Sequence, residues 1–422
     1  MSMSTSISRC MSLSMALFAL AACAELQEDE APAEPAGSSR PIEIETNHFN
    51  RAGGGWVGTW GAAPQALGTN SLANVTLRQI VHVSAGGSSV RLRLDNTFGD
   101  QPLTFSDVHI ALPDGGAAVR PETDRAVTFA GAASVTVAQG ARALSDPVAL
   151  DVPARSDLAV SMFLPGTIGQ LTGHGSAGQT SFVSTAGDHA GETGGASFTS
   201  PIFEWYWLSG VDVLSPSTRG TIVALGDSIT NGSNSAFGEN HRWPDILADR
   251  LLARGKGARS VVNKGIGGAQ LLTFRADCCP TAAAGLARVE GDVIAQAGVT
   301  HTIVLLGVND IGFGRDAPSL IAGFQQLIAQ LHAKDIAVVG ATILPFGGSI
   351  VDSPANEATR EAVNAWILTS NAFDGVVDFD AAVRDPADPA RLLPAFDSGD
   401  HLHPGDAGHV AMGSAVSLSV FR

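Results

Sequence analysis

The sequence predicts an α/β protein in which an N-terminal β-sandwich domain precedes a three-layer α/β/α domain. From about residue 53 to residue 214, hydrophobic residues alternate with a period of two, and no amphipathic helix interrupts them. From Thr221 onward, strand-like apolar runs at 221–225, 260–263, 300–306, 336–342 and 376–379 alternate with helical patterns. One of these helical patterns places five apolar residues on a single stripe: Leu320, Phe324, Leu327, Ile328 and Leu331. Many short strands with glycine and proline turns are typical of a β-sandwich. Alternating strands and helices instead predict a parallel sheet, here of five strands, with helices on both faces.

Length and charge limit the classes of function. The chain has 422 residues, which is enough for two domains, and 45% of them are hydrophobic. Its formal net charge is -16, and no basic cluster interrupts the acidic background. Because such a surface repels polyanions, the composition argues against nucleic-acid binding.

The N-terminus is typical of an export signal. A single positive charge, Arg9, precedes a short apolar core at 13–20, which is too short to span a bilayer. The segment Leu20-Ala21-Ala22-Cys23 resembles a bacterial lipobox, which implies cleavage after residue 22 and lipid attachment to Cys23. The alternative is an ordinary secretory peptide with a chance cysteine.

These features define four predicted segments. Residues 1–22 are a lipoprotein signal peptide, and 23–50 contain the lipidated cysteine and an acidic Pro/Ala linker. Residues 51–215 form the β-sandwich domain, and 216–422 the α/β domain. We expect a lipid-anchored protein of the cell envelope, periplasmic or on the outer-membrane surface, with secretion as the alternative. Membrane contact would occur only through the anchor.

The remaining cysteines give no metal signal. Cys10 would be removed with the signal peptide, which leaves the neighbours Cys278 and Cys279. In an oxidising compartment they form a vicinal disulfide or stay as thiols. Neither a CxxC motif nor a histidine at zinc-site spacing accompanies them, so we expect no metal and no other cofactor.

Aromatic residues gather at both ends of the β-rich half, at Trp56 and Trp60 and again at 203–207. One interpretation is a sugar-stacking platform on the surface. The interpretation that we favour is that these rings fill the sandwich core or the domain interface. The histidines of this half have no carboxylate at catalytic spacing, and we treat them as structural: His82, His109, His174 and His189.

The segment 221–232 (TIVALGDSITNG) contains the first candidate catalytic residue. Its apolar half predicts a buried strand, and Gly226-Asp227-Ser228 then breaks the run. Ligands of parallel α/β sheets bind at the carboxyl ends of the strands, so Ser228 is a candidate nucleophile. The alternative is that Ser228 only caps the following helix.

Two further strand ends carry groups that can stabilise an anion. After the second strand, Gly268 lies in a glycine-rich turn where a backbone N–H can approach a substrate oxygen closely. After the third strand, the side-chain amide of Asn309 can donate to a developing oxyanion. Taken separately, the glycine segment is a weak signal that a plain tight turn explains, and an Asx-turn explains an isolated Asn309 better than an oxyanion donor does.

The segment 397–404 (DSGDHLHP) supplies a candidate base. Asp400 lies three residues before His403, close enough to accept the Nδ1–H of its ring and leave Nε2 free. A metal site built from Asp400, His401, His403 and His409 is the rival interpretation, although no HExxH spacing supports it. Together, one serine, one backbone amide, one asparagine amide and one Asp-His pair are the groups that acyl transfer needs.

These four blocks, between residues 220 and 422, resemble the SGNH (GDSL) hydrolase superfamily. The resemblance implies a flavodoxin-like α/β/α domain, with Ser228 as nucleophile, His403 as base and Asp400 as its orienting partner. It further implies an oxyanion hole from the N–H groups of Ser228 and Gly268 and the amide of Asn309. Gly267 is an alternative to Gly268, and His401 has no implied role.

A looser resemblance links the chain to bacterial esterases that carry an N-terminal β-domain and lie near acetylxylan esterases and lysophospholipase-like proteins. It rests on residues 56–60 (WVGTW) and Arg242-Trp243-Pro244. No GxSxG motif occurs anywhere in the chain, which argues against an α/β-hydrolase with a nucleophile elbow.

The expected function is therefore hydrolysis of carboxylic esters by a Ser-His-Asp mechanism. We favour an acetylated carbohydrate as the substrate, and a lysophospholipid or aryl ester is the alternative. An alternative of another class is a carbohydrate-binding surface lipoprotein whose hydrolase domain is inactive. The sequence leaves the oligomeric state open.

Overall fold

The computed structural model describes residues 55–69, 72–255, 257–274 and 281–421. These residues belong to one compact unit. The predicted signal peptide, Cys23, the linker and the Cys278–Cys279 pair lie outside the described residues. Within them, no helix is long and apolar enough to cross a membrane.

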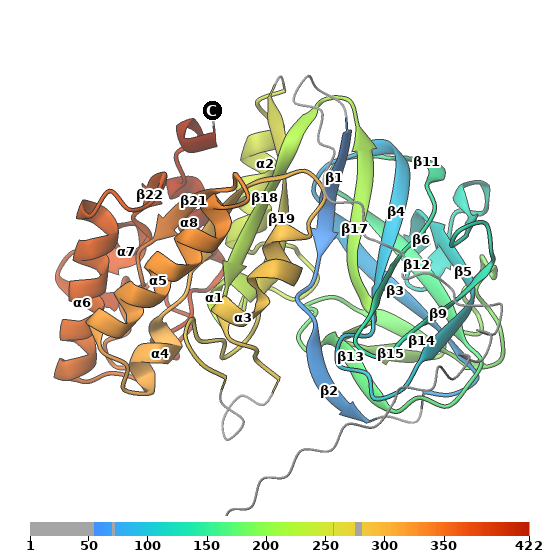
Figure 1. The fold of residues 1–422 in the computed structure, drawn as a ribbon, viewed down its shortest axis with the longest axis horizontal. Coiled ribbons are helices and arrows are strands. Elements are labelled where there is room, and N and C mark those ends of the chain that lie inside the picture. The colour runs from blue at the N-terminus through green and yellow to red at the C-terminus, as the bar shows by residue number, and fades with distance from the viewer. Residues whose placement is uncertain (1–54, 70–71, 256, 275–280, 422) are drawn as a thin grey trace, which may run out of the picture. The chain divides into compact units, whose positions relative to one another are not determined.

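The N-terminal region is β-rich, and its two larger sheets are antiparallel (Figure 1). The first sheet has five strands: β1 (Gly55–Gly61), β17 (Leu208–Ser215), β4 (Gly87–Asp95), β10 (Arg142–Leu144) and β11 (Val148–Val152). The second has seven: β15 (Ser200–Ile202), β14 (Ser181–Ala186), β3 (Val75–Val83), β12 (Ser156–Leu164), β5 (Leu103–Ala111), β8 (Arg125–Val127) and β9 (Ser134–Val137). Side chains from both sheets, such as Leu92 and Val160, share one hydrophobic core. This arrangement fits the predicted sandwich.

Smaller elements complete this region. A three-stranded sheet contains β2 (Gln65–Thr69), β13 (Gln170–His174) and β16 (Trp205–Tyr206). A short hairpin, β6 (Pro113–Gly115) and β7 (Ala118–Val119), is followed by the 3-10 turn η1 (Pro121–Thr123).

Most of the clustered aromatic rings are buried. Trp60 and Trp205 contact each other edge to face, with ring centroids 4.9 Å apart, and Trp207 is 1% exposed. These rings belong to the core, so the core-filling interpretation is confirmed for them. Phe203 differs, because 51% of its surface is exposed.

The C-terminal region contains the predicted parallel sheet of five strands. Its order is β19 (Ala258–Gly265), β18 (Thr218–Gly226), β20 (Val299–Leu305), β21 (Ala337–Ala341) and β22 (Gly375–Val377). The strands run parallel in the order 2-1-3-4-5, which is the flavodoxin-like arrangement. The predicted fold class is therefore confirmed.

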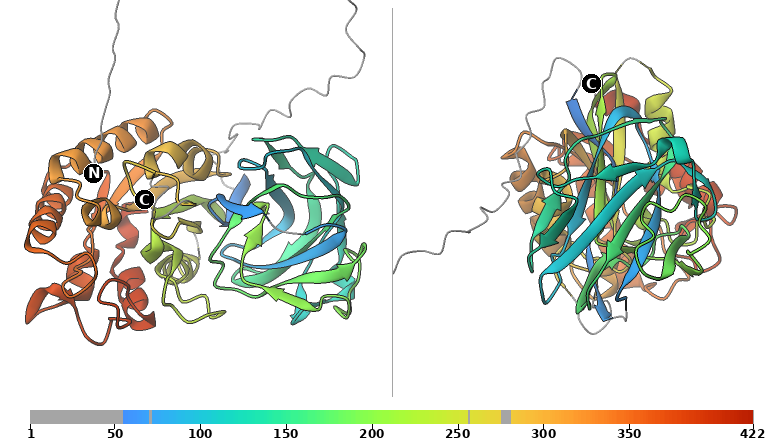
Figure 2. Two further views of the ribbon diagram at one scale, coloured as in Figure 1. Left: turned by 90° about the horizontal axis from the view of Figure 1, so that it is seen from below. Right: turned by 90° about the vertical axis from the view of Figure 1, so that its right-hand side faces the viewer.

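Helices lie on both sides of this sheet (Figure 2). In chain order, they are α1 (Ser228–Asn231), α2 (Trp243–Leu252), α3 (Gly285–Val289), the π-helical turn η2 (Glu290–Ile294), α4 (Val308–Gly312), α5 (Ala317–His332), α6 (Pro354–Thr369), α7 (Phe379–Val383), α8 (Asp406–Ala415) and η3 (Leu418–Phe421). A hairpin of β23 (Arg384–Asp385) and β24 (Asp388–Leu392) separates α7 from α8. Helix α2 packs on α8, and α5 packs on α3 and α6.

The predicted stripe of α5 is buried, as its spacing indicated. Leu320, Phe324, Leu327 and Leu331 all face the core and are at most 1% exposed. The last strand ends earlier than predicted: β22 ends at Val377, and Asp378 caps α7, which begins at Phe379. An acidic side chain that accepts the N–H of Ala381 starts a helix where the apolar run alone predicted a longer strand.

Candidate active site

Ser228 lies at the start of a four-residue helix at the carboxyl end of β18. The Asp227 side chain caps this helix by accepting the N–H of Ile229 at 3.0 Å. A Cβ on Gly226 would lie 2.0 Å from the Thr230 hydroxyl oxygen, so only glycine permits this turn. Ser228 is thus the first residue of α1, and the cap of this helix is Asp227 instead of Ser228.

The structure brings Ser228, His403 and Asp400 into one hydrogen-bonded relay. The Ser228 Oγ lies 2.8 Å from Nε2 of His403, and Nδ1 of His403 lies 2.7 Å from Oδ2 of Asp400. A carboxylate can only accept, so Nδ1 carries the proton, and Nε2 is then free to accept from the serine hydroxyl. Both distances fit the tautomer that the sequence spacing predicted.

Asp400 is held as an anion by several donors. Partial burial opposes ionisation of this carboxyl, but the backbone N–H and ring of His403 and the N–H of Leu402 outweigh it. They hold the pKa of Asp400 far below its usual range. The side-chain amide of Asn234 donates to Oδ2 of the same carboxylate at 3.0 Å, a contact that sequence spacing did not indicate.

The two candidate anion-binding loops contact each other. Gly268 has a φ of 74°, in the left-handed region that favours glycine, and its neighbour Ala269 accepts a hydrogen bond from the Asn309 amide at 3.0 Å. The carboxylate of Asp310 accepts the N–H groups of Leu271 and Leu272 at 2.7 and 3.0 Å. Asn309 and the loop of Gly268 are therefore fixed relative to each other. Gly267 is exposed.

Two buried carboxyls lie beneath these loops. Burial, together with the nearby charge of Asp310, raises the pKa of Asp227 to about 7. Burial likewise raises the pKa of Asp310 to about 6. The buried guanidinium of Arg288 donates to the carbonyl of Gly226 at 2.6 Å and ties the end of β18 to α3.

The β-rich region also reaches this site. Nε2 of His174, on β13, lies 2.8 Å from Oδ1 of Asn231, the last residue of α1, while Nδ1 lies 3.0 Å from the carbonyl of Ala63. His174 is 3% exposed, and burial lowers its pKa. It remains structural as predicted, but it supports the helix that carries Ser228.

Three other histidines do have carboxylate partners, contrary to what spacing suggested. His82 pairs with Asp157 at 2.7 Å across two adjacent strands. The other two pairs are His109 with Asp124 at 2.9 Å and His189 with Glu192 at 3.3 Å. The first two partners are 75 and 15 residues away in sequence, so spacing could not reveal them.

The rival metal interpretation gains no support from the geometry. His401 pairs with Asp397 at 2.5 Å, whereas His403 pairs with Asp400. His409 is fully buried in α8. Among the described residues, no group of three or more histidine, cysteine or acidic side chains is arranged to hold a metal ion.

Comparison with known families identifies the class of protein to which the C-terminal region belongs. Residues 224–411 match the model of the GDSL-like lipase/acylhydrolase family. The C-terminal region is therefore an SGNH/GDSL hydrolase domain, and the chain is a carboxylic ester hydrolase of that class. No curated protein matches the chain.

Several solved structures are similar to about half of this chain. An aryl esterase from M. smegmatis is 16% identical, with a TM-score of 0.38, and the match covers 46% of this chain and 95% of that one. A carbohydrate acetylesterase from Sinorhizobium meliloti is 13% identical, with a TM-score of 0.38 and coverage of 46% and 95%. A GDSL-like lipase from Bacteroides thetaiotaomicron is 18% identical, with a TM-score of 0.34 and coverage of 48% and 87%.

Proposed function

We propose that the chain is a serine esterase in which Ser228 is the nucleophile, His403 the general base and Asp400 the residue that orients His403. The observation that carries this assignment is the relay of two hydrogen bonds, 2.8 Å from Ser228 to His403 and 2.7 Å from His403 to Asp400. A serine hydroxyl is a weak nucleophile until a base accepts its proton, and this relay supplies that base.

The reaction proceeds in two acyl-transfer steps. As the Ser228 oxygen attacks the ester carbonyl, Nε2 of His403 takes its proton, and the charge of Asp400 stabilises the resulting imidazolium. Collapse of the tetrahedral intermediate breaks the ester bond, and His403 returns the proton to the leaving alcohol. Water, deprotonated by His403, then attacks the acyl-serine and releases the carboxylic acid and free Ser228.

The negative charge of the intermediate is stabilised by three donors. We assign these to the backbone N–H groups of Ser228 and Gly268 and to the Nδ2 amide of Asn309. The hydrogen bond from Asn309 to Ala269 uses one N–H of the amide and leaves the second for the substrate oxygen. Donors held in place before reaction stabilise charge at no cost of reorganisation.

As substrate, we propose acetyl groups on a carbohydrate. The envelope anchor predicted from the sequence and the β-rich region suit an enzyme that removes substituents from a polymer. A second candidate, a lysophospholipid or aryl ester, is favoured by two exposed apolar side chains that follow β19 and β21. Phe274 is 53% exposed and Ile350 is 95% exposed.

Two ester panels test the proposal on protein that lacks residues 1–23. One contains p-nitrophenyl esters of increasing chain length, and the other contains acetylated xylan and acetylated sugars. Activity limited to acetyl esters, including the polymer, supports the carbohydrate assignment, whereas rates that rise with chain length support the second candidate. Binding of polysaccharide without cleavage of any ester would favour an inactive hydrolase domain, and loss of activity with a chelator would favour the metal interpretation.

A further inference from the structure

An exposed aromatic pair lies near the candidate catalytic residues. Phe203, which follows β15, and Phe237, in the loop after α1, are 51% and 53% exposed. Their ring centroids are 5.6 Å apart at an interplanar angle of 78°. Exposed phenylalanines in contact with each other leave ring faces in water, which is unfavourable unless a ligand covers them.

The pair lines a cavity of about 250 Å³. Its wall continues along the loop after α1, through Asn231 and Asn234. Asn234 donates to the carboxylate of Asp400, so one end of this cavity lies next to the candidate catalytic residues. The opposite wall comes from the β-rich region, at Gly175 and Ser176.

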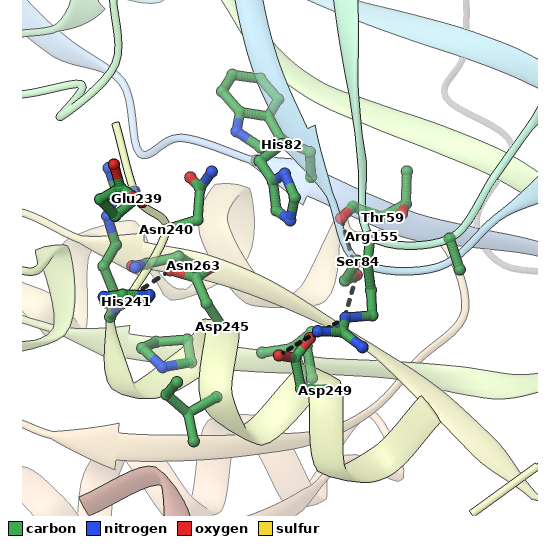
Figure 3. A pocket seen from close by; sticks show the side chains of 18 of the residues that line it. Thr59, His82, Ser84, Arg155, Glu239, Asn240, His241, Asp245, Asp249 and Asn263 are labelled. Carbon is green, nitrogen blue, oxygen red and sulfur yellow. Dashed lines mark hydrogen bonds and ion pairs between the residues drawn. The ribbon is translucent and has the colours of Figure 1, made fainter. Parts of the chain in front are cut away.

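A second and larger cavity, of about 510 Å³, adjoins the first. Asn240 and Arg242 line both cavities. His82 and Arg155 from the β-rich region and Asp245 and Asp249 from the α2 segment face the second cavity (Figure 3). The two cavities are therefore neighbours with a common wall, and we call them together the trough between the β-rich region and the hydrolase domain.

Arg242 is fixed where the two cavities meet. Its guanidinium donates to the carbonyl of Ala177 and lies over the ring of Trp205, 5.9 Å from the centroid. A Cβ on Gly232 would lie 2.4 Å from Cγ of Arg242, so the loop after α1 closes against this side chain. The shared wall of the trough is thus preorganised.

The lining of the trough indicates an uncharged, hydroxyl-rich ligand. Most of its charged side chains are paired within the protein: Arg155 binds Asp249, His82 binds Asp157, and His241 binds Asp406. The carboxylate of Glu239 makes no ion pair to another described residue and can accept from hydroxyl groups. The side-chain amide of Asn240 makes no hydrogen bond to another described residue and can donate and accept. With a net charge of -16 on the chain, a polyanion would be repelled.

We propose that this trough binds a neutral, acetylated polysaccharide chain, with a sugar ring stacked on the Phe203–Phe237 pair. The apolar C–H faces of a sugar ring suit the negative faces of aromatic rings, and its hydroxyls suit amide, histidine and carboxylate groups. This inference rests on the proposed esterase function and specifies its substrate class. It also gives the β-rich region a role, because that region forms one wall of the trough.

The test compares two substrates in a double variant, Phe203→Ala with Phe237→Ala. We expect kcat/KM on p-nitrophenyl acetate to stay within about twofold of wild type, since this small ester needs only the relay. On acetylated xylan or acetylated xylohexaose we expect kcat/KM to fall about tenfold or more, mainly through KM, because two stacking rings are lost. Leu368→Ala, which removes a 42% exposed apolar side chain on α6, is the matched control and leaves both substrates unaffected.

Binding provides a second measurement without turnover. Calorimetric titration of acetylated xylohexaose into Ser228→Ala protein should show binding that Asn240→Ala weakens and the double phenylalanine variant abolishes. If the wild type cleaves p-nitrophenyl acetate and the double variant keeps its full activity on the polymer, the proposal that the trough binds polysaccharide is wrong. The esterase proposal would still stand. The trough proposal is also wrong if the double variant loses kcat/KM equally on both substrates. It is likewise wrong if the loss of kcat/KM is confined to long-chain micellar esters. Failure of the wild type on every ester contradicts the esterase proposal itself.

Discussion

The side-chain amide of Asn234 and the ring of His403 share one oxygen of Asp400. Asn234 Nδ2 lies 3.0 Å from Oδ2, and His403 Nδ1 lies 2.7 Å from the same atom. Asn234 has a φ of 65°, a conformation that places its short side chain against the carboxylate. We therefore regard Asn234 as a positioning residue that fixes Asp400 beneath the imidazole.

Replacing Asn234 by glycine should lower kcat with little change in KM for p-nitrophenyl acetate. Glycine accepts the positive φ, so the variant loses only the amide. Because the Asp400 side chain is 44% exposed, we expect the lost hydrogen bond to contribute about 1 kcal/mol, or about fivefold in rate. Asn371→Gly, at a remote positive-φ asparagine, is the control. Equal rates for the two variants would remove Asn234 from the relay.

Asn309→Ala should reduce kcat by about 10²–10³, the usual loss for one oxyanion donor. The expected effect on KM is small, because the donor acts on charge that develops after binding. The hydrogen bond to Ala269 is lost as well, so thermal unfolding must show that the variant is folded before rates are compared. A folded variant with unchanged kcat would show that Asn309 has no part in the mechanism.

Asp227→Asn should raise the melting temperature more at pH 8.5 than at pH 5. Burial raises the pKa of Asp227 to about 7, above the ordinary value of 3.8. The stability that its protonated form contributes is therefore complete below pH 3.8 and is lost as the pH rises through 7. Asparagine keeps the cap on Ile229 and cannot ionise.

The control for this substitution is Asp316→Asn. Asp316 caps α5, and hydrogen bonds from Ser319 lower its pKa, so its ionised form stabilises the fold above pH 3.8. Calorimetry should show no increase in the melting temperature of Asp316→Asn at pH 8.5. If Asp227→Asn and the wild type have the same melting temperature at both pH 5 and pH 8.5, ionisation of Asp227 does not destabilise the fold.

Cys23→Ser should move the protein from the membrane fraction to the soluble fraction of cells that express the full chain. The expectation follows from the segment Leu20-Ala21-Ala22-Cys23, in which the cysteine would carry the lipid. Fractionation followed by mass spectrometry of the N-terminal peptide distinguishes a lipidated cysteine from a simple secreted N-terminus. A variant that partitions as wild type would exclude Cys23 as the anchor.

Local sequence patterns predicted the elements that local forces determine. The apolar run at 221–225 and its glycine turn were sufficient to place Ser228 at the carboxyl end of a buried strand. The 3.6-residue spacing of Leu320 and Phe324 predicted α5, because burying one stripe of a helix is a local requirement. The pairing of Asp400 with His403 followed from a separation of three residues.

Long-range contacts could not be predicted in the same way. His174 and Asn231 are 57 residues apart, and Asn234 and Asp400 are 166 apart, with no periodicity to link them. Composition alone gave no means to separate the exposed Phe203 from its buried neighbours Trp205 and Trp207. Which ring faces water depends on the small sheet of β2, β13 and β16, whose pairing is set by tertiary packing.

The nucleophilic role of Ser228 is tested most directly by p-nitrophenyl acetate hydrolysis with wild type and Ser228→Ala side by side. Among the described residues, the Ser228 hydroxyl bonds only to His403, so the variant should unfold near the wild-type temperature. We predict that its turnover falls by about 10⁴-fold or more, as in other enzymes that lose a serine nucleophile. A folded Ser228→Ala protein that retains more than a tenth of wild-type kcat would contradict the account.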